Sequence, residues 1–443
     1  MFQRFWPATL LSLGLLILAT AAIFAPFTIF ALVLGVSLLG IFWRWPFIGV
    51  YAVLAAAALS EGGRLSLGGV SFLVLDVVAA SVLGLWFCQK LILKKRFQFG
   101  ILEGSLSFFW LLALLSLLLN AKELSGAELQ FAFLGWVRFV ALSGIFLVVR
   151  DLAQGQLQRQ KIFQSLLLVG VFLALAGFVL LQIFPDFAAA GLTELGFDPH
   201  LNRLTGTFLD PNLMAGALVL FLSLLGGKFL SAQRFRQQIF WLILAGVLLL
   251  AFFLTLSRSG LLALATAGFI LGMLQNRKLL LGLIGIVVLA GLSIPHLQNR
   301  LLEFQQSLTA LSEESPHVLD PTAELRVKSW QEGLRIWQGS PFFGTGFGSY
   351  KFRQSFVGED SHAATGSDAS LITVLAGTGV VGLLSFLFFW GCLAWELFKH
   401  RKQAAGALAA LGGIFVHAIF VNTLFFAPLV VFILVTGGVA SRD

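Results

Sequence analysis

The stretch PTAELRVKSWQEGLRIWQGSPFFGTGFGSYKF, residues 321–352, lies inside the only long polar segment of this sequence, which extends from Pro295 to Ala369. Apolar runs fill the sequence on both sides of that segment. Loops of this length without secondary structure are uncommon in compact proteins. The polar segment is therefore predicted to fold into a structure of its own.

A helical pattern occupies residues 323–338 of the polar segment. Pro321 suits the start of a helix, and Pro341 stops one. Two tryptophans and two leucines share one face, which predicts an amphipathic helix lying flat on the membrane interface or across the mouth of a helix bundle. These apolar residues are Leu325, Trp330, Leu334 and Trp337.

Composition decides the class of protein around this segment. The 443 residues are 58% hydrophobic and 11% charged, with a mean hydropathy of +0.93. Soluble domains carry about 25% charged residues, so this chain is predicted to be an integral membrane protein. Apolar stretches of about 18 residues or more exclude a transmembrane barrel, whose strands are shorter and alternate. We predict an all-α polytopic bundle: transmembrane helices in 1–294, an extracytoplasmic helical loop in 295–369, and further transmembrane helices in 370–443.

Basic residues set the predicted topology. Most of the 29 Lys and Arg lie at every second junction between apolar runs, which the positive-inside rule assigns to the cytoplasm. Both termini are then cytoplasmic, and the polar segment faces outward. The net charge of +8 follows this topology and predicts no nucleic-acid partner. Twelve to fourteen spans are expected, over 5–23, 26–43, 46–60, 70–93, 102–120, 131–149, 162–184, 211–227, 238–256, 259–275, 278–294, 370–398, 404–421 and 424–440.

Two outward junctions carry arginines beside helix starts. Arg258 lies in LTLSRSGLL, where a charge between apolar helices either binds an anion or partner, or extends its head group to the interface. NRLTGTFLDPNLMAG places Arg203, Asp210 and Asn212 at the entrance to a span. Asp-Pro-Asn is an ordinary signal for a helix start, so Asp210 has a structural interpretation as the N-cap.

The polar segment carries the other candidates. Arg326 lies on the amphipathic helix, one turn before Trp330, where a solvated charge is the ordinary interpretation. His362 titrates in the range that suits a general base, although a loop histidine in water is the simpler interpretation. Asp368 follows six residues later and could act as a base or cap the next span.

Together these residues predict a particular chemistry. Arginines from separate segments could bind a diphosphate through bidentate, charge-assisted hydrogen bonds, while a nearby histidine or carboxylate takes the proton of a hydroxyl nucleophile. No nucleotide-binding loop or metal-binding motif is present in the sequence, and neither a cofactor nor a metal is predicted. This pattern suits a donor that is already activated as a lipid pyrophosphate.

The ordered motifs RLTGTFLDPN, LTLSRSG, ELRVKSWQEGLRIWQGSPFFGTGFGSY and LAGTGVVGLL resemble the bacterial O-antigen ligase and O-antigen polymerase family. The resemblance implies a GT-C-like membrane glycosyltransferase of the inner membrane, acting in polysaccharide biosynthesis for the cell envelope. It implies transfer of a glycan from undecaprenyl pyrophosphate to a lipid, glycan or protein hydroxyl, without metal and with inversion. Arg258 and Arg326 match the arginines that hold the pyrophosphate.

The chain departs from the family pattern at the proposed base. The family places a histidine directly before the span that follows the polar segment. In this chain Asp368 stands near that position, and His362 lies six residues earlier. Both therefore remain candidates. The alternative function is a transporter or flippase for a lipid-linked or polar solute, for which Arg138, Asp76 and Glu396 are the possible intramembrane charges. Arg138 is predicted either to pair across the bundle or to face a cavity for the lipid phosphate.

Overall fold

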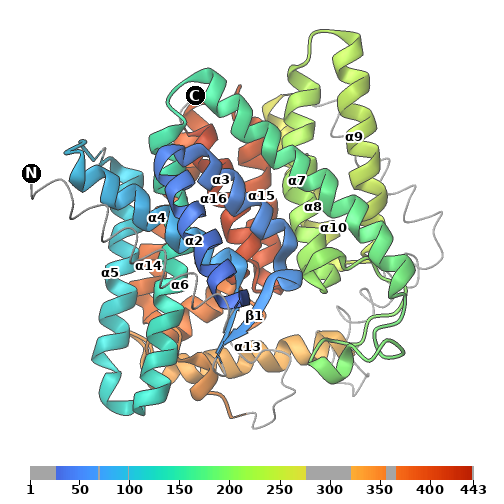
Figure 1. The fold of residues 1–443 in the computed structure, drawn as a ribbon. Coiled ribbons are helices and arrows are strands. Elements are labelled where there is room, and N and C mark those ends of the chain that lie inside the picture. Colours follow the sequence, from blue (N-terminus) through green and yellow to red (C-terminus); the bar gives the residue numbers. More distant parts are fainter. Residues whose placement is uncertain (1–25, 68–69, 98, 276–320, 356–365, 442–443) are drawn as a thin grey trace, which may run out of the picture.

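The computed structural model describes residues 26–67, 70–97, 99–275, 321–355 and 366–441. Within these residues, eight helices are long and apolar enough to cross a membrane, and four shorter apolar helices accompany them. The prediction of an all-α polytopic membrane protein is confirmed (Figure 1). The predicted spans 5–23 and 278–294 lie outside the described residues. The apolar helices are α2 (Pro26–Arg44), α3 (Pro46–Leu59), α4 (Val74–Ile92), α5 (Ile101–Leu119), α6 (Gly126–Leu152), α7 (Gln156–Ile183), α8 (Pro211–Ser231), α9 (Phe235–Leu254), α10 (Arg258–Leu274), α14 (Ser370–Lys399), α15 (Ala405–Phe420) and α16 (Ala427–Ala440).

A short hairpin replaces the first turn of one predicted span. Strands β1 (Arg64–Leu67) and β2 (Val70–Leu73) pair antiparallel, and α4 begins only at Val74. The prediction that a helix starts at residue 70 was therefore wrong. The carboxylate of Asp76 accepts a hydrogen bond of 3.1 Å from the backbone N–H of Leu73, which starts the helix after the strand.

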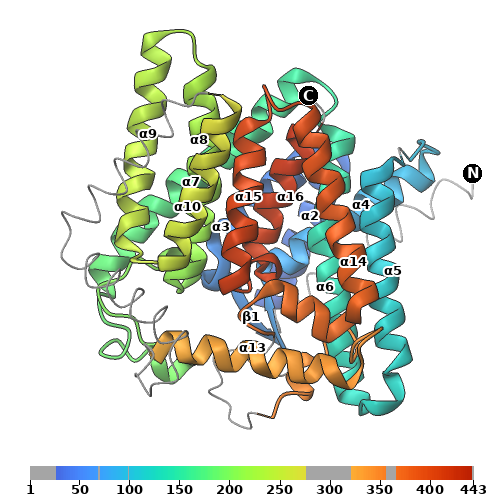
Figure 2. The same cartoon turned by 180° about the vertical axis from the view of Figure 1, so that it is seen from behind.

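Helix α13 (Pro321–Gly339) lies across one end of the bundle, roughly perpendicular to the other helices (Figures 1 and 2). The ring of Trp330 on this helix packs on that of Phe420 at the end of α15, with the two ring centroids 6.1 Å apart. Ile336 is buried with Tyr350 and Ala376. The predicted amphipathic helix across the bundle mouth is confirmed, and this end of the molecule is called the α13 end below.

The chain that follows α13 is bound to α14 at a break in that helix. Gly379 has φ +66° and ψ −170° inside α14, so the local helical hydrogen bonds are interrupted. The freed backbone groups pair with residues 341–346 through hydrogen bonds of 2.9–3.2 Å. They join Thr345 N to Ala376 O, Gly346 N to Gly377 O, Val380 N to Pro341 O, and Val381 N to Phe342 O. Residues 341–346 and 376–381 are called the glycine junction.

Only glycine fits at two positions of this junction. A Cβ at Gly379 would lie 2.2 Å from the carbonyl oxygen of Phe342. Gly344 has φ +68°, and its Cβ would lie 2.4 Å from the carbonyl carbon of Gly377. Helix α5 supports the same place, because Asn120 Nδ2 donates a hydrogen bond of 3.0 Å to Gly344 O. Gly344, which follows the helix-ending Pro341, and Gly379 inside α14 are thus contact points between the two backbones.

Two ion pairs stabilise the end of the bundle opposite α13. Arg150 of α6 binds Glu103 of α5 at 2.7 Å, with both side chains at most 11% exposed. Lys90 of α4 binds Asp151 at 2.5 Å, and Asp151 also accepts a hydrogen bond of 2.9 Å from Trp86 Nε1. Each charge is paired and hydrogen-bonded, as burial requires.

Candidate active site

A cavity of about 550 Å³ opens at the α13 end of the bundle. Its wall combines the hairpin, α13 and the first turns of several apolar helices. Three arginines from separate elements line it together with five carboxylates, so the site is highly charged within an apolar bundle. The charged lining residues are Glu61, Arg64, Asp76, Arg138, Asp198, Asp210, Arg326 and Asp368.

Helix direction adds positive potential to this cavity. The lining includes Asp76 in the first turn of α4, Asn212 in that of α8, Thr373 in that of α14 and Ala427 at the start of α16. Helix N-termini carry a partial positive charge and point backbone N–H groups outward. Four such ends at one cavity favour an anionic ligand.

Four of the predicted site residues line this cavity, and two of them come from the polar segment. Arg326 reaches it from α13, and Asp368 from the segment before α14. The two segments are joined by Ser329, whose hydroxyl accepts a hydrogen bond of 2.9 Å from the Asp368 backbone N–H. Ala369 is the N-cap of α14 and makes no side-chain cap bond, so the interpretation of Asp368 as a helix cap was wrong. His362 lies outside the described residues, and Trp330 packs on α15 without lining the cavity.

Asp210 and Asn212 line the cavity at the start of α8. Asp210 Oδ1 accepts hydrogen bonds from the backbone N–H groups of Asn212 (2.7 Å) and Leu213 (2.8 Å), which confirms its role as the N-cap. The hydroxyl of Ser257 donates to Asn212 Oδ1 at 2.9 Å. Asn212 therefore links the starts of α8 and α10.

Arg203 and Arg258 flank the cavity and are absent from its lining. Arg203 Nε donates a hydrogen bond of 3.0 Å to the Thr255 carbonyl, and Nη2 lies 3.4 Å from Asn212 Oδ1. Arg258 is the first residue of α10, directly after Ser257. The structure thus brings Arg326 to the cavity wall, whereas these two arginines are not among its lining residues.

Two cavity arginines were missed as site residues. Arg138 of α6 binds Asp76 of α4 through Nε at 2.8 Å and also lines the cavity. It was predicted to pair or to face a cavity and does both, while its binding of a lipid phosphate stays a prediction. Arg64 of β1 binds Glu61, with Nε 2.8 Å from the carboxylate. The hairpin was not predicted, so nothing in the sequence analysis directed Arg64 inward. The three-residue spacing of Glu61 and Arg64 was the one feature of the sequence that indicated this ion pair.

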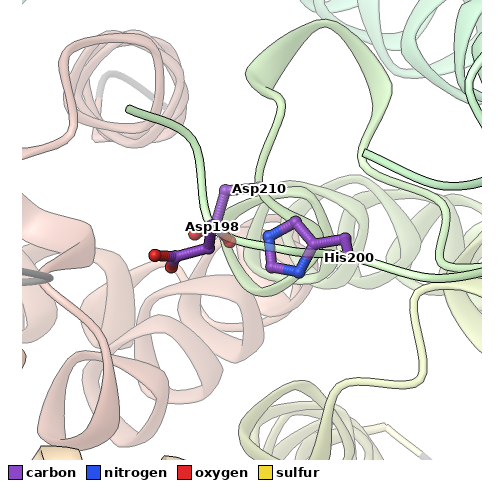
Figure 3. A group of neighbouring side chains, drawn as sticks. All are labelled: Asp198, His200 and Asp210. Atoms are coloured by element: carbon purple, nitrogen blue, oxygen red, sulfur yellow. The ribbon is translucent and has the colours of Figure 1, made fainter. Parts of the chain in front are cut away.

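A second group of polar side chains lies at the cavity edge. Asp198, His200 and Asp210 have ligand atoms within 4.8 Å of one another, a separation that suits a divalent cation (Figure 3). Asp210 Oδ1 is already engaged by two backbone N–H groups, so one oxygen of that carboxylate remains for a cation. The sequence analysis did not find this group.

Hydrogen bonds fix the far end of α13 and lower the pKa of one acid there. Glu332 is buried and accepts from Arg335 at 2.7 Å and from the Ser355 hydroxyl at 3.0 Å. These bonds, above all those from Arg335, lower the pKa of Glu332 to about 2. Burial raises the pKa of Tyr350, a cavity residue, so its phenol stays protonated at neutral pH.

The fold and the cavity define a polytopic helical membrane protein with a charged pocket covered by a transverse amphipathic helix. Residues 242–387 match the family model of O-antigen ligase, a segment that contains Arg258, α13, Asp368 and the glycine junction. Through this segment the chain is similar to the O-antigen ligase family, and the similarity suggests a membrane glycosyltransferase-like role. No curated protein matched the chain.

Proposed function

We propose that this protein transfers a glycan from undecaprenyl pyrophosphate to a hydroxyl group of a lipid, glycan or protein acceptor. The observation that carries the proposal is the meeting of Arg326 and Asp368, a cation and a potential base, at one cavity. Both lie inside the segment that matches the O-antigen ligase model. The four helix N-termini at the same cavity support an anionic donor.

In this proposal the arginines bind the donor pyrophosphate. Arg326 on α13 makes the direct contact, through bidentate hydrogen bonds to phosphate oxygens. Arg258 approaches from the start of α10, and Arg203 holds the loop beside it through the Thr255 carbonyl. Asp210 and Asn212 support this arrangement, because they fix the starts of α8 and α10.

Transfer then proceeds as one displacement. His362 or Asp368 takes the proton of the acceptor hydroxyl, and the oxygen attacks the anomeric carbon of the glycan. The bond between that carbon and the phosphate oxygen breaks, and undecaprenyl pyrophosphate leaves with the electron pair. Attack opposite the leaving group inverts the anomeric centre, and the arginines stabilise the leaving charge without a metal.

The positive-inside rule supports an orientation for this reaction. The basic ends of the spans face the cytoplasm of a bacterial cell, both termini lie there, and the cavity opens on the outer side of the inner membrane. A lipid-linked donor suits that side, because its pyrophosphate already carries the activation that a nucleotide provides in the cytoplasm.

Reconstitution tests the proposal. The purified protein is placed in lipid vesicles with an undecaprenyl-pyrophosphate glycan and several acceptors, and the products are identified by mass. Arg326→Ala should abolish transfer. Lys328→Ala is the matched control, because Lys328 lies on the same helix, is half exposed and pairs with Glu324 outside the cavity. Equal transfer by both variants would remove the role of Arg326.

Two further measurements separate the remaining alternatives. Asp368→Asn and His362→Ala are compared at fixed donor concentration, and the variant that loses transfer identifies the base. Full activity in both would show that neither side chain acts as one. Movement of the lipid-linked glycan across the vesicle membrane without a covalent product would favour a flippase.

A further inference from the structure

Arg138 differs from the other ion-paired cations inside the spans. It lies twelve residues after the start of α6, about 18 Å along the helix axis. Its side chain is 45% exposed, whereas those of Lys90 and Arg150 are 8% and 11% exposed in their pairs at the opposite end. A charge deep in an apolar helix is costly, and the exposed part of this one faces the cavity.

The pairing with Asp76 orients the guanidinium and leaves much of it available. Asp76 Oδ1 accepts from Arg138 Nε at 2.8 Å, while Oδ2 accepts from the Leu73 backbone N–H at 3.1 Å. The carboxylate is thus fixed in the first turn of α4. Among the described residues no other hydrogen bond to Arg138 is formed, so its two terminal nitrogens are open to a ligand.

The surroundings of Arg138 form one continuous face. The residues of α6 that line the cavity are spaced so that they share one face of the helix. On that face Arg138 is flanked by Gly135 and Phe139. The rings of Phe139, Phe347 and Phe425 pack together beside it, with centroids 5.5–6.1 Å apart. An apolar wall with one oriented cation is the usual form of a site that selects a charged group on a larger ligand.

We propose that Arg138, held by Asp76, forms an anion-binding subsite on the α4–α6 side of the cavity. The subsite takes a phosphate or carboxylate group of a bound substrate, through its two terminal nitrogens. The proposal rests on the glycan transfer proposed above and adds one more cationic contact beside those of Arg326 and Arg258. The anion is either part of the donor pyrophosphate or a charged substituent of the acceptor.

Two assays distinguish these sources. Binding of undecaprenyl pyrophosphate is measured with the reconstituted protein, and the KM of transfer is measured for a phosphorylated and a neutral form of the same acceptor. Arg138→Gln should weaken one of these interactions by about 10- to 100-fold, the range for a hydrogen bond to a charged group. A loss in donor affinity assigns the anion to the donor. A higher KM for the phosphorylated acceptor alone assigns it to the acceptor.

Two controls keep the test decisive. Lys328→Gln removes a cation outside the cavity and should change neither quantity. Arg138→Lys retains the charge opposite Asp76 but loses the planar fork, so it should keep the melting temperature while binding the anion more weakly. Wild-type donor affinity and KM in Arg138→Lys, or in a stable Arg138→Gln, would overturn the subsite. If Arg326→Ala still loses transfer in that case, the proposed function stands without it.

Discussion

Replacement of Gly379 by alanine should damage the glycine junction more than any other methyl group added to α14. The backbone at Gly379 has φ +66° and ψ −170°, a region that only glycine adopts without strain. The added Cβ would also lie 2.2 Å from Phe342 O, whereas ordinary contacts begin at 3.4 Å. The two backbones would have to separate at this point.

The expected destabilisation has two parts. Backbone strain contributes about 1–3 kcal/mol, and a lost hydrogen bond that leaves its buried partner unsatisfied adds about 1–3 kcal/mol. The bond at risk joins Val381 N to Phe342 O, at 3.2 Å. Gly379→Ala should therefore lose about 2–6 kcal/mol of stability. Transfer should fall as well, because the junction holds α13 and Arg326 over the cavity.

Gly391 supplies the matched control. It lies in the same helix, and a Cβ there would meet nothing within 4 Å. Gly391→Ala should leave stability unchanged or raise it by up to about 1 kcal/mol, the helix preference of alanine over glycine. Thermal unfolding in detergent and glycan transfer in vesicles measure both variants. The same melting temperature and activity in Gly379→Ala as in Gly391→Ala would refute the reasoning.

Three other predictions concern charge. Glu332→Gln should lower the melting temperature at neutral pH. Because folding depresses the pKa of Glu332 from 4.5 to about 2, the difference in melting temperature from wild type should shrink as the pH falls through that window. A difference that stays constant with pH would contradict this prediction. Asp151→Ala should cost about 3–5 kcal/mol, since it leaves Lys90 buried without its partner, and a loss under about 1 kcal/mol would show that the pair is solvated. Chelation by EDTA should leave transfer unchanged; a loss that Mg²⁺ restores in wild type but not in His200→Ala would instead assign a cation to the group in Figure 3.

Periodicity and charge patterning predicted most of the fold. Apolar runs of membrane length and basic residues at alternate junctions predicted the helices from α2 to α16 closely, because both signals are local. The hairpin at 64–73 was missed, since four-residue strands between two spans carry no periodicity that separates them from helix. The break in α14 was missed too, because a positive φ at Gly379 arises from contact with a segment over thirty residues earlier.

The site was predicted less completely than the fold. Arg326 and Asp368 were found because a charged residue on an amphipathic helix and a carboxylate before a span are visible in the sequence. The place of Arg64 at the cavity depends on the hairpin, which was not predicted. The partner of Arg138 depends on which helices are neighbours, and spacing along the chain does not report that. The contacts of Arg203 depend likewise on the Thr255 carbonyl and the Asn212 amide, which only the folded chain brings near.

The main chain contributes positive potential at the cavity through the N-terminal ends of α4, α8, α14 and α16. Peptide dipoles persist whichever side chains surround them, so substitution of a lining arginine or acid leaves this part of the potential in place. A protein with the same helix arrangement would therefore keep this main-chain contribution even where individual arginines and acids of the cavity differ.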